Sequence, residues 1–260
     1  MRRRPFVAAL LPVLLLASCG PASTTGSSGT GGATTELTVF AAASLRVVFD
    51  EVGLEFQDAY PGTSVRFSYG GSADLISQLD AGAPADVLVT ASGPTMDRAI
   101  DAGAVTAAPV VIATNVPVLI VPADNPAGLT DLESAAAPGV DLVVCAPQVP
   151  CGAAAQTLAE NADIDLTPVS EESSVTDVLG KVTTGQSDAG IVYATDATDA
   201  ADAGEAVTTI DLPGADQART EYPAAVTAFT GQPEQAQALV DFLRQDPAQA
   251  LLADAGFQKP

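Results

Sequence analysis

The amino-acid sequence predicts an α/β fold in which mostly parallel sheets are covered by helices on both faces. Short apolar runs of strand type alternate with amphipathic stretches, and hydrophobic residues make up 47% of the chain. The stretch 36–260 is about one and a half typical domain lengths, which is enough for two lobes with a core each. In such sheets ligands collect at the carboxyl ends of the strands, so we expect a binding site there.

Apolar runs bounded by turn residues predict the strands. They are 37–40, 65–69, 86–90, 116–123, 141–146, 190–194, 207–212 and 222–229. Amphipathic periodicity predicts the helices. They are 45–59, 73–81, 95–102, 129–137, 152–161, 175–184, 232–244 and 247–255.

The N-terminus predicts export. An arginine triplet at 2–4 precedes an apolar stretch at 6–16, which is too short to span a membrane but suits a secretory signal. The stretch ends in Leu-Ala-Ser-Cys, which resembles the lipobox of bacterial lipoproteins. This resemblance implies a lipoprotein signal peptide at 1–18 and lipidation of Cys19. An ordinary signal peptide with an incidental cysteine is the alternative.

Residues 19–35 are rich in Gly, Ser and Thr and carry no charge. Such a composition cannot bury a core and behaves as flexible coil. We therefore expect 19–35 to tether the folded body to a lipid anchor on the outer face of the cytoplasmic membrane.

The chain is strongly acidic, with 10 Lys and Arg against 32 Asp and Glu. Loss of the three signal-peptide arginines leaves seven basic residues against 32 acidic ones, hence a net charge of −25. A surface this negative argues against nucleic acid and against an electrostatic membrane patch. An anionic ligand would have to be held by local dipoles and not by net charge.

Missing residue types exclude much enzyme chemistry. The sequence has no histidine, which rules out a histidine-based triad, an HExxH zinc site and an imidazole general base. The GxSxG, SxxK and GxxxxGK motifs are also absent. We therefore expect neither an enzyme nor a cofactor, and a hydrolase with a carboxylate pair is the remaining alternative.

Cys145 and Cys151 are separated by five residues, which is neither the CxxC redox spacing nor a metal quartet. In an oxidising compartment we expect a disulfide that pins the turn at 146–150 and contributes about 2–3 kcal/mol. Two buried free thiols are the alternative.

Four turns follow strand-type runs and open helices. Three of them end at Ser44, Ser72 and Cys151, and the fourth leads to Val175. A helix start carries unpaired backbone N–H groups and a partial positive charge, so four starts that converge would form a socket for an anion. Alternatively, Ser44 and Ser72 are N-caps that stabilise their own helices by about 1 kcal/mol each.

The chain contains the segments TVFAAASL (38–45), GGSADLISQLDAGAPADV (70–87), VPCG (149–152), GIVYATDA (190–197) and EYPAAV (221–226). In their order and approximate spacing these segments resemble the periplasmic molybdate-binding proteins of bacterial ABC importers. The similarity extends from about residue 37 to the C-terminus. It implies a type II periplasmic solute-binding fold, in which two α/β lobes joined by two crossing hinge strands close on one tetrahedral oxyanion.

The resemblance also implies the lobe boundaries. Lobe I comprises 36–115 and 224–260, and lobe II comprises 116–223. The two crossings are expected near Asn115 to Pro117 and near Tyr222 to Pro223.

The family's oxyanion ligands carry over to five positions. Ser44 and Ser72 would each donate through the hydroxyl and the backbone N–H. Cys151, where many relatives have Ala, and Val175 would donate through the backbone N–H alone. Tyr193 would donate through its phenol, so that the metal itself has no direct protein ligand. Tyr193 can instead be a core residue at the end of its strand.

Uncharged donors suit an anion without protons. Molybdate, tungstate and sulfate carry no proton near neutral pH, whereas hydrogen phosphate needs an acceptor. Arg46 follows Ser44 and is expected to face outward. We therefore expect a monomeric extracytoplasmic lipoprotein that binds molybdate, and also tungstate, for delivery to an ABC permease. A binding protein for sulfate or thiosulfate is the first alternative, and a secreted hydrolase the second.

Overall fold

The computed structural model describes residues 34–260. The expected signal peptide at 1–18 and the lipidation of Cys19 lie outside the described residues, as does nearly all of the tether at 19–35. The first strand already begins at Thr35, the last residue of that expected tether. In the described part of the chain, no helix has the length and apolar character needed to cross a membrane.

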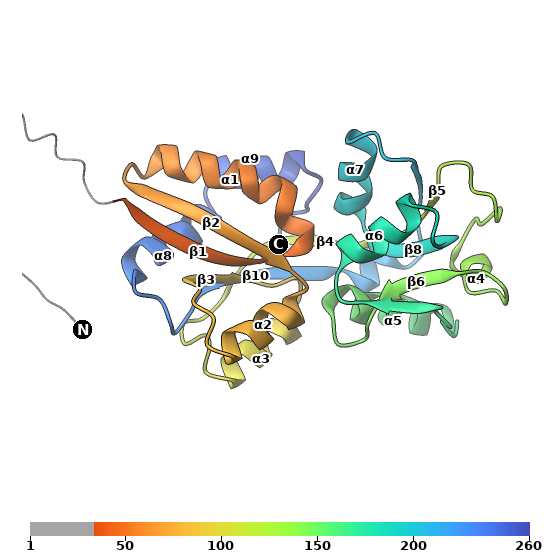
Figure 1. Ribbon diagram of the computed structural model, residues 1–260, viewed down its shortest axis with the longest axis horizontal. Coiled ribbons are helices and arrows are strands. Elements are labelled where there is room, and N and C mark those ends of the chain that lie inside the picture. The colour runs from red at the N-terminus through yellow and green to blue at the C-terminus, as the bar shows by residue number, and fades with distance from the viewer. Residues whose placement is uncertain (1–33) are drawn as a thin grey trace, which may run out of the picture. The chain divides into compact units, whose positions relative to one another are not determined.

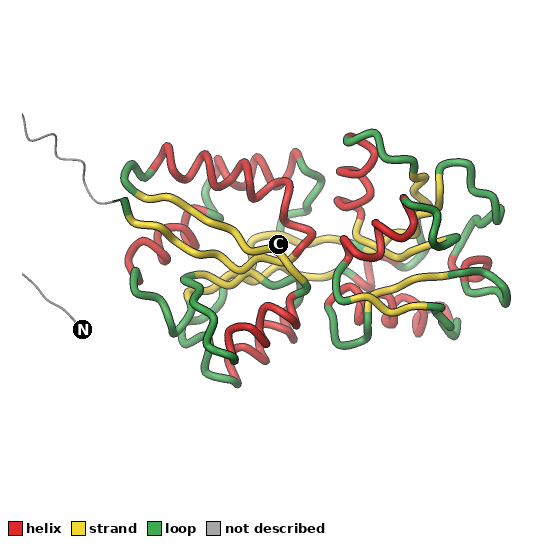
Figure 2. The backbone as a smooth tube through the Cα atoms, in the orientation of Figure 1, coloured by secondary structure: helices red, strands yellow, loops and turns green. Residues whose placement is uncertain are grey.

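The described chain folds into two α/β lobes, each built on a five-stranded sheet (Figures 1 and 2). The strand order in the first sheet is β2-β1-β3-β10-β4 and in the second β7-β6-β8-β5-β9. The first sheet consists of β1 (Thr35–Ala42), β2 (Thr63–Gly70), β3 (Val87–Val89), β4 (Val110–Asn115) and β10 (Thr220–Val226). The second consists of β5 (Pro117–Pro122), β6 (Leu142–Cys145), β7 (Ser170–Glu172), β8 (Ala189–Tyr193) and β9 (Val207–Ile210).

Both sheets are mixed, but in each of them four of the five strands run in the same direction, so the expectation of mostly parallel sheets is confirmed. Strand β1 pairs in parallel with β2 and β3, and β6 pairs in parallel with β7 and β8. Strand β10 is antiparallel to β3 and β4, and β5 is antiparallel to β8 and β9. Strands β5 and β10 both reach their sheets from the other lobe along the chain. Because they enter from the opposite side, they run against their neighbours.

The two sheets repeat one plan. Strands β1 to β4 take the same places in the first sheet as β6 to β9 take in the second, and β10 corresponds to β5. The turns after β1 and β2 in the first lobe therefore occupy the same places as the turns after β6 and β7 in the second lobe. This equivalence places four helix starts on the two facing edges.

Helices cover both faces of each sheet (Figure 1). They are α1 (Arg46–Ala59), α2 (Ser72–Asp80), α3 (Gly93–Asp101), α4 (Leu132–Ala135), α5 (Pro150–Ala162), α6 (Val175–Thr183), α7 (Ala194–Asp202), α8 (Pro233–Phe242) and α9 (Asp246–Asp254). The side chains of β1 point alternately to the two faces of the sheet, and both faces are apolar. Val39 and Ala41 pack with Phe49 of α1, whereas Phe40 packs on the other face with Leu75 of α2.

Lobe II follows the same rule. Ile191 of β8 packs in one cluster with Leu158 of α5, and its neighbour Val192 packs in another with Val178 of α6. Consecutive side chains of a strand point to opposite faces, so one apolar strand supplies both cores.

Some elements are absent from the sequence-based expectations, namely β4, β7 and α7. Helix α7 has the sequence ATDATDAAD, in which alanine is the only apolar residue, so its buried face gives little periodic signal. Strand β7 is the short polar run SEE at the edge of its sheet. Helix α4 is confined to Leu132–Ala135, within the expected range 129–137.

The first crossing between the sheets is short, because only Val116 separates β4 from β5. On the return path, Thr220 already pairs with Asn115 of β4. The chain thus rejoins the first sheet before Tyr222 and Pro223, where the second crossing is expected. The lobe boundaries drawn at 115/116 and 223/224 stay a prediction.

Candidate functional site

A cavity of about 20 Å³ lies where the strand-to-helix turns of the two lobes meet. A cavity this small suits a small inorganic ion and not a sugar or an amino acid. None of the described residues that line it is charged. They are Ala42, Ala43, Ser44, Gly70, Gly71, Ser72, Ala91, Val149, Pro150, Cys151, Ser174, Val175 and Tyr193. The structure therefore brings all five sequence-predicted positions to one cavity.

Lobe I contributes two serines, and neither caps a helix. A 3-10 helix at Ala43–Leu45 links β1 to α1, and Ser44 is its buried middle residue. Ser72 is the first residue of α2, whose N-cap is Gly71. No side-chain cap hydrogen bond is present at either start, so the N-cap alternative for the two serines is wrong.

The hydroxyls of these serines have defined partners. The Ser44 hydroxyl lies 2.9 Å from the Tyr222 hydroxyl. Ser72 Oγ accepts a hydrogen bond of 3.1 Å from the backbone N–H of Ala91. Because Ser72 Oγ acts as an acceptor there, its own hydrogen remains available as a donor to the cavity.

Lobe II contributes two helix starts. Cys151 follows Pro150 in the first turn of α5, and Val175 is the first residue of α6. Ser174 is the N-cap of α6, and its Oγ accepts from the Asp177 N–H at 3.3 Å. The N–H groups of Cys151 and Val175 precede the first residue that can bond within its own helix. They are therefore available as donors.

Tyr193 ends β8, and its phenol is buried. Its Oη has no hydrogen-bond partner among the described residues. Burial, reinforced by the nearby Asp196, raises the pKa of the Tyr193 phenol above its usual value. The phenol therefore stays protonated and can donate. A buried hydroxyl without a partner is costly, so an acceptor in this cavity would stabilise the protein.

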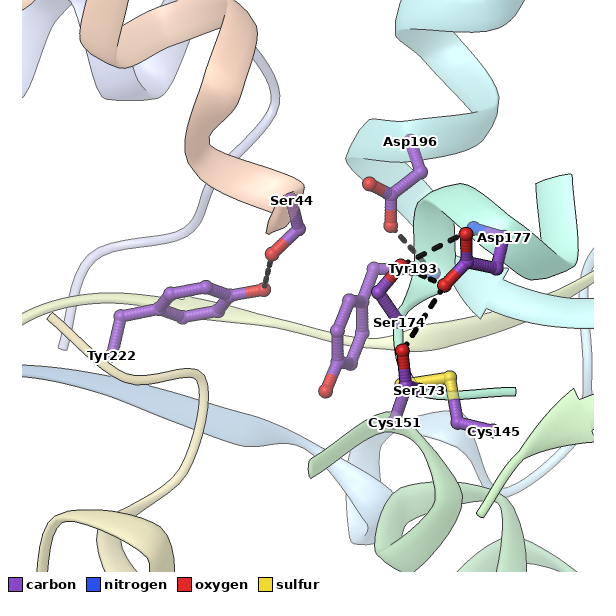
Figure 3. Close-up of a disulfide and its surroundings, with 9 residues drawn as sticks. All are labelled: Ser44, Cys145, Cys151, Ser173, Ser174, Asp177, Tyr193, Asp196 and Tyr222. Carbon is purple, nitrogen blue, oxygen red and sulfur yellow. Dashed lines mark hydrogen bonds between the residues drawn. A yellow bond between two sulfur atoms is a disulfide. The ribbon is translucent and has the colours of Figure 1, made fainter. Parts of the chain in front are cut away.

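A disulfide joins Cys145 to Cys151, as the sequence predicts, and the alternative of two free thiols is wrong (Figure 3). The bond connects the end of β6 to the first turn of α5. Both cysteines are buried. The cross-link therefore fixes the turn that presents the Cys151 N–H to the cavity.

The two lobes approach each other closely at Gly71. A Cβ added at Gly71 would lie 2.0 Å from the carbonyl oxygen of Ser173, which precedes α6 in the other lobe. No real carbon–oxygen contact is this short, so any side chain at Gly71 would separate the lobes here. Across the same gap, Arg98 of α3 donates to the Gln148 carbonyl at 3.3 Å.

Arg46 does not reach the cavity. Its exposed side chain lies over the Tyr69 ring, 4.6 Å from the ring centroid. The expectation that Arg46 faces outward is confirmed.

Asp196 is a buried carboxyl behind the cavity. It accepts a hydrogen bond of 3.1 Å from the Tyr193 N–H. Burial raises the pKa of Asp196 to about 7, against the lowering effect of the Tyr193 N–H and with a further increase from Asp199. Within residues 34–260 no cluster of acidic residues and cysteines could hold a metal ion.

Sequence and structure comparisons agree on the class of protein. A profile described as "bacterial extracellular solute-binding protein" matches residues 37–258. The molybdate-binding protein ModA of Mycobacterium tuberculosis H37Rv is 40% identical over 246 residues, which cover 94% of this chain and 93% of that relative. The chain belongs to the bacterial extracellular solute-binding proteins.

Solved structures of related proteins share the fold of this solute-binding protein. The sulfate-binding protein SubI from Mycobacterium tuberculosis H37Rv matches with a TM-score of 0.73 at 25% identity, over 86% of this chain and 87% of that one. A periplasmic molybdate-binding protein from Azotobacter vinelandii matches with a TM-score of 0.72 at 19% identity, over 86% of this chain and 99% of that one. The fold is the expected type II periplasmic solute-binding fold.

The sequence did not assign two residues to the site of this solute-binding protein. Tyr222 touches Ser44 from the crossing strand β10, and Gly71 meets the opposite lobe. By themselves Gly70 and Gly71 signal a turn, and in the context of the family segment they are expected to let the backbone come close to the ligand, but nothing in the pattern indicates contact with the other lobe. Tyr222 lies in a strand-type run. The one available signal was the EYPAAV segment, which placed Tyr222 at the expected second crossing but gave it no part in the site.

Asp196→Asn should remove a pH-dependent loss of stability between pH about 4 and about 7. An unfolded aspartate titrates near 3.8, whereas burial holds the pKa of Asp196 at about 7. The folded state binds more protons across this window, so the free energy of unfolding contributed by Asp196 is full below pH about 4 and falls until pH about 7. Urea unfolding at several pH values in this range measures the free energy of unfolding. Asp165→Asn, a change at an exposed aspartate, is the control. The prediction would be wrong if the free energy of unfolding changed with pH equally in the wild type and in Asp196→Asn.

Proposed function

We propose that this protein binds molybdate outside the cytoplasm and delivers it to the permease of an ABC importer. The observation that carries the proposal is the cavity itself, because all five predicted donor positions line it and none of its described lining residues is charged. The mycobacterial relative, 40% identical over nearly the whole chain, is named as a molybdate-binding protein and supports the same ligand.

Donors of this kind suit a fully deprotonated oxyanion. Two serine hydroxyls, the Tyr193 phenol and the N–H groups of Cys151 and Val175 all donate, and the described lining residues include no carboxylate. Hydrogen phosphate carries a proton that would need an acceptor side chain. Molybdate and tungstate carry none near neutral pH, so we propose that both bind through their oxygens.

Sulfate is the second candidate ligand, and it is favoured by the likeness to the mycobacterial sulfate-binding protein. The choice between sulfate and molybdate depends on size. Donors set at the distance of the larger ion leave the smaller one with long, weak hydrogen bonds. The Cys145–Cys151 disulfide supports such discrimination, because a fixed turn cannot contract around sulfate.

Delivery requires that the lobes open and close around the ion. Hydroxyls and N–H groups come from both lobes, so the ion stabilises the closed state more than the open one. Neutral donors also allow release, since no buried ion pair must be broken. We propose a monomeric binding protein without enzymatic activity or cofactor, held at the membrane through lipid on Cys19.

Molybdate and tungstate should each raise the melting temperature more than sulfate or phosphate at equal concentration. A ligand at about a thousand times its dissociation constant adds about 4 kcal/mol to the free energy of unfolding. Thermal unfolding followed by dye fluorescence or circular dichroism measures the shift. If only sulfate raises the melting temperature, the ligand is sulfate and not molybdate. If none of the ions raises it, the proposal of oxyanion binding is wrong.

Ser44→Ala combined with Ser72→Ala should weaken molybdate binding by more than a hundredfold. Hydrogen bonds to a charged partner contribute about 1.5–3 kcal/mol each, so two lost bonds amount to about 3–6 kcal/mol. Isothermal titration calorimetry measures the affinity. Ser77→Ala is a matched control on α2, since this exposed hydroxyl donates to the Ala73 carbonyl within its own helix. Unchanged affinity in the double variant would place the ion elsewhere.

Gly71→Ala should weaken molybdate binding by at least tenfold without lowering the melting temperature of the ligand-free protein. The backbone at Gly71 has φ −59° and ψ 132°, which alanine adopts freely, so the added Cβ clashes only with Ser173 when the lobes are closed. Calorimetry and thermal unfolding separate the two effects. Gly93→Ala is the control, because its Cβ would meet nothing within 4 Å. Wild-type affinity in Gly71→Ala would show that this contact does not limit closure.

A further inference from the structure

Tyr222 is a fully buried residue that contacts the candidate site from behind. It lies on the crossing strand β10 and does not line the cavity. Its hydroxyl is 2.9 Å from Ser44 Oγ, and the two residues are 178 positions apart in the sequence. Figure 3 shows its ring extending to Ser44 beside the ring of Tyr193.

The ring of Tyr222 is held by two aromatic neighbours. The Tyr193 ring meets it at a centroid distance of 6.2 Å and an angle of 65°, and the Phe257 ring meets it at 5.3 Å and 89°. Edge-to-face pairs of this geometry are favourable beyond their buried area. Tyr222 thus touches one expected donor of each lobe, namely Ser44 of lobe I and Tyr193 of lobe II.

The hydrogen bond between Tyr222 and Ser44 has one direction that serves anion binding. A serine hydroxyl has a single hydrogen, so Ser44 can donate to an anion only when its oxygen accepts from Tyr222. Burial raises the pKa of the Tyr222 phenol well above its usual value, so the phenol keeps its hydrogen. A chain of donors from Tyr222 to Ser44 to the anion is also cooperative, since each bond polarises the next.

We propose that Tyr222 is a positioning residue for oxyanion capture. Its hydroxyl donates to Ser44 Oγ and turns the Ser44 hydrogen into the cavity, and its ring supports the ring of Tyr193. The inference rests on the proposed function and extends it to a residue that does not touch the ion. It also connects the crossing strand to both halves of the site.

A purely structural role would behave differently. If Tyr222 only filled space between Tyr193 and Phe257, removal of its hydroxyl would leave anion affinity unchanged, because phenylalanine keeps the ring. If it orients Ser44, the hydroxyl matters only while the Ser44 hydroxyl is present. A double-mutant cycle distinguishes the two cases.

The experiment compares wild type, Tyr222→Phe, Ser44→Ala and the double variant, each titrated with molybdate by calorimetry. We expect Tyr222→Phe to weaken binding by about threefold to tenfold, the range of one neutral hydrogen bond. In the Ser44→Ala background the same change should have no further effect. Wild-type affinity in Tyr222→Phe, or an equal loss in both backgrounds, would overturn the inference.

Tyr60→Phe is the control, because Tyr60 also packs in an aromatic cluster, with its ring centroid 4.6 Å from that of Phe56, but its hydroxyl makes no hydrogen bond to a described residue that lines the cavity. Its affinity should equal that of wild type. Thermal unfolding without ligand verifies that each variant folds. Failure of the wild type to bind molybdate would instead count against the proposed function, and the same cycle with sulfate would then test Tyr222. Binding of neither ion by the wild type would overturn both proposals.

Discussion

The convergence of four strand-to-helix turns on one small cavity is the constraint on which the rest of the structure depends. Parallel pairing of β1 with β2 and of β6 with β7 brings the carboxyl ends of neighbouring strands to one edge in each lobe. The crossing strands β5 and β10 then hold the two edges face to face. A helix start can present its N–H groups only if the turn before it is tight. The Cys145–Cys151 disulfide fixes the turn before α5, and the missing side chain of Gly71 lets the turn before α2 approach the other lobe.

Electrostatics explains why such turns, and not cationic side chains, suit an anion in this chain. No basic side chain of the described residues lines the cavity, and four of them have other partners: Arg66 pairs with Glu36, Lys181 with Glu172, Arg219 with Asp216, and Arg46 stacks on Tyr69. With 32 acidic residues in the sequence, a long-range field cannot attract an anion. Oriented N–H and O–H dipoles act at contact distance, where the distant carboxylates are screened.

The sequence could predict what depends on neighbours along the chain. The four turns, the donor positions within them and the Cys145–Cys151 pair are all local patterns, and the family resemblance added Tyr193. What it could not predict depends on distant pairing. The Ser44–Tyr222 contact spans 178 positions, the Gly71–Ser173 approach joins two lobes, and the antiparallel entry of β5 and β10 follows from the crossing itself. Helix α7 was not predicted, because alanine is its only apolar residue and gives little periodic signal.

The hinge and the site share contacts, so opening of the lobes must disturb the donors. The Asn115 side chain accepts from the Val116 N–H at 2.9 Å and donates to the Thr195 hydroxyl at 2.8 Å. Thr195 lies in the first turn of α7 beside Asp196, whose carboxyl accepts from the Tyr193 N–H. Any rotation about Val116 therefore moves a hydrogen-bonded unit that carries Tyr193. If the proposed lobe opening rotates the chain about Val116, the change in torsion angles would shift a donor directly, so the proposed ion release would be coupled to the opening.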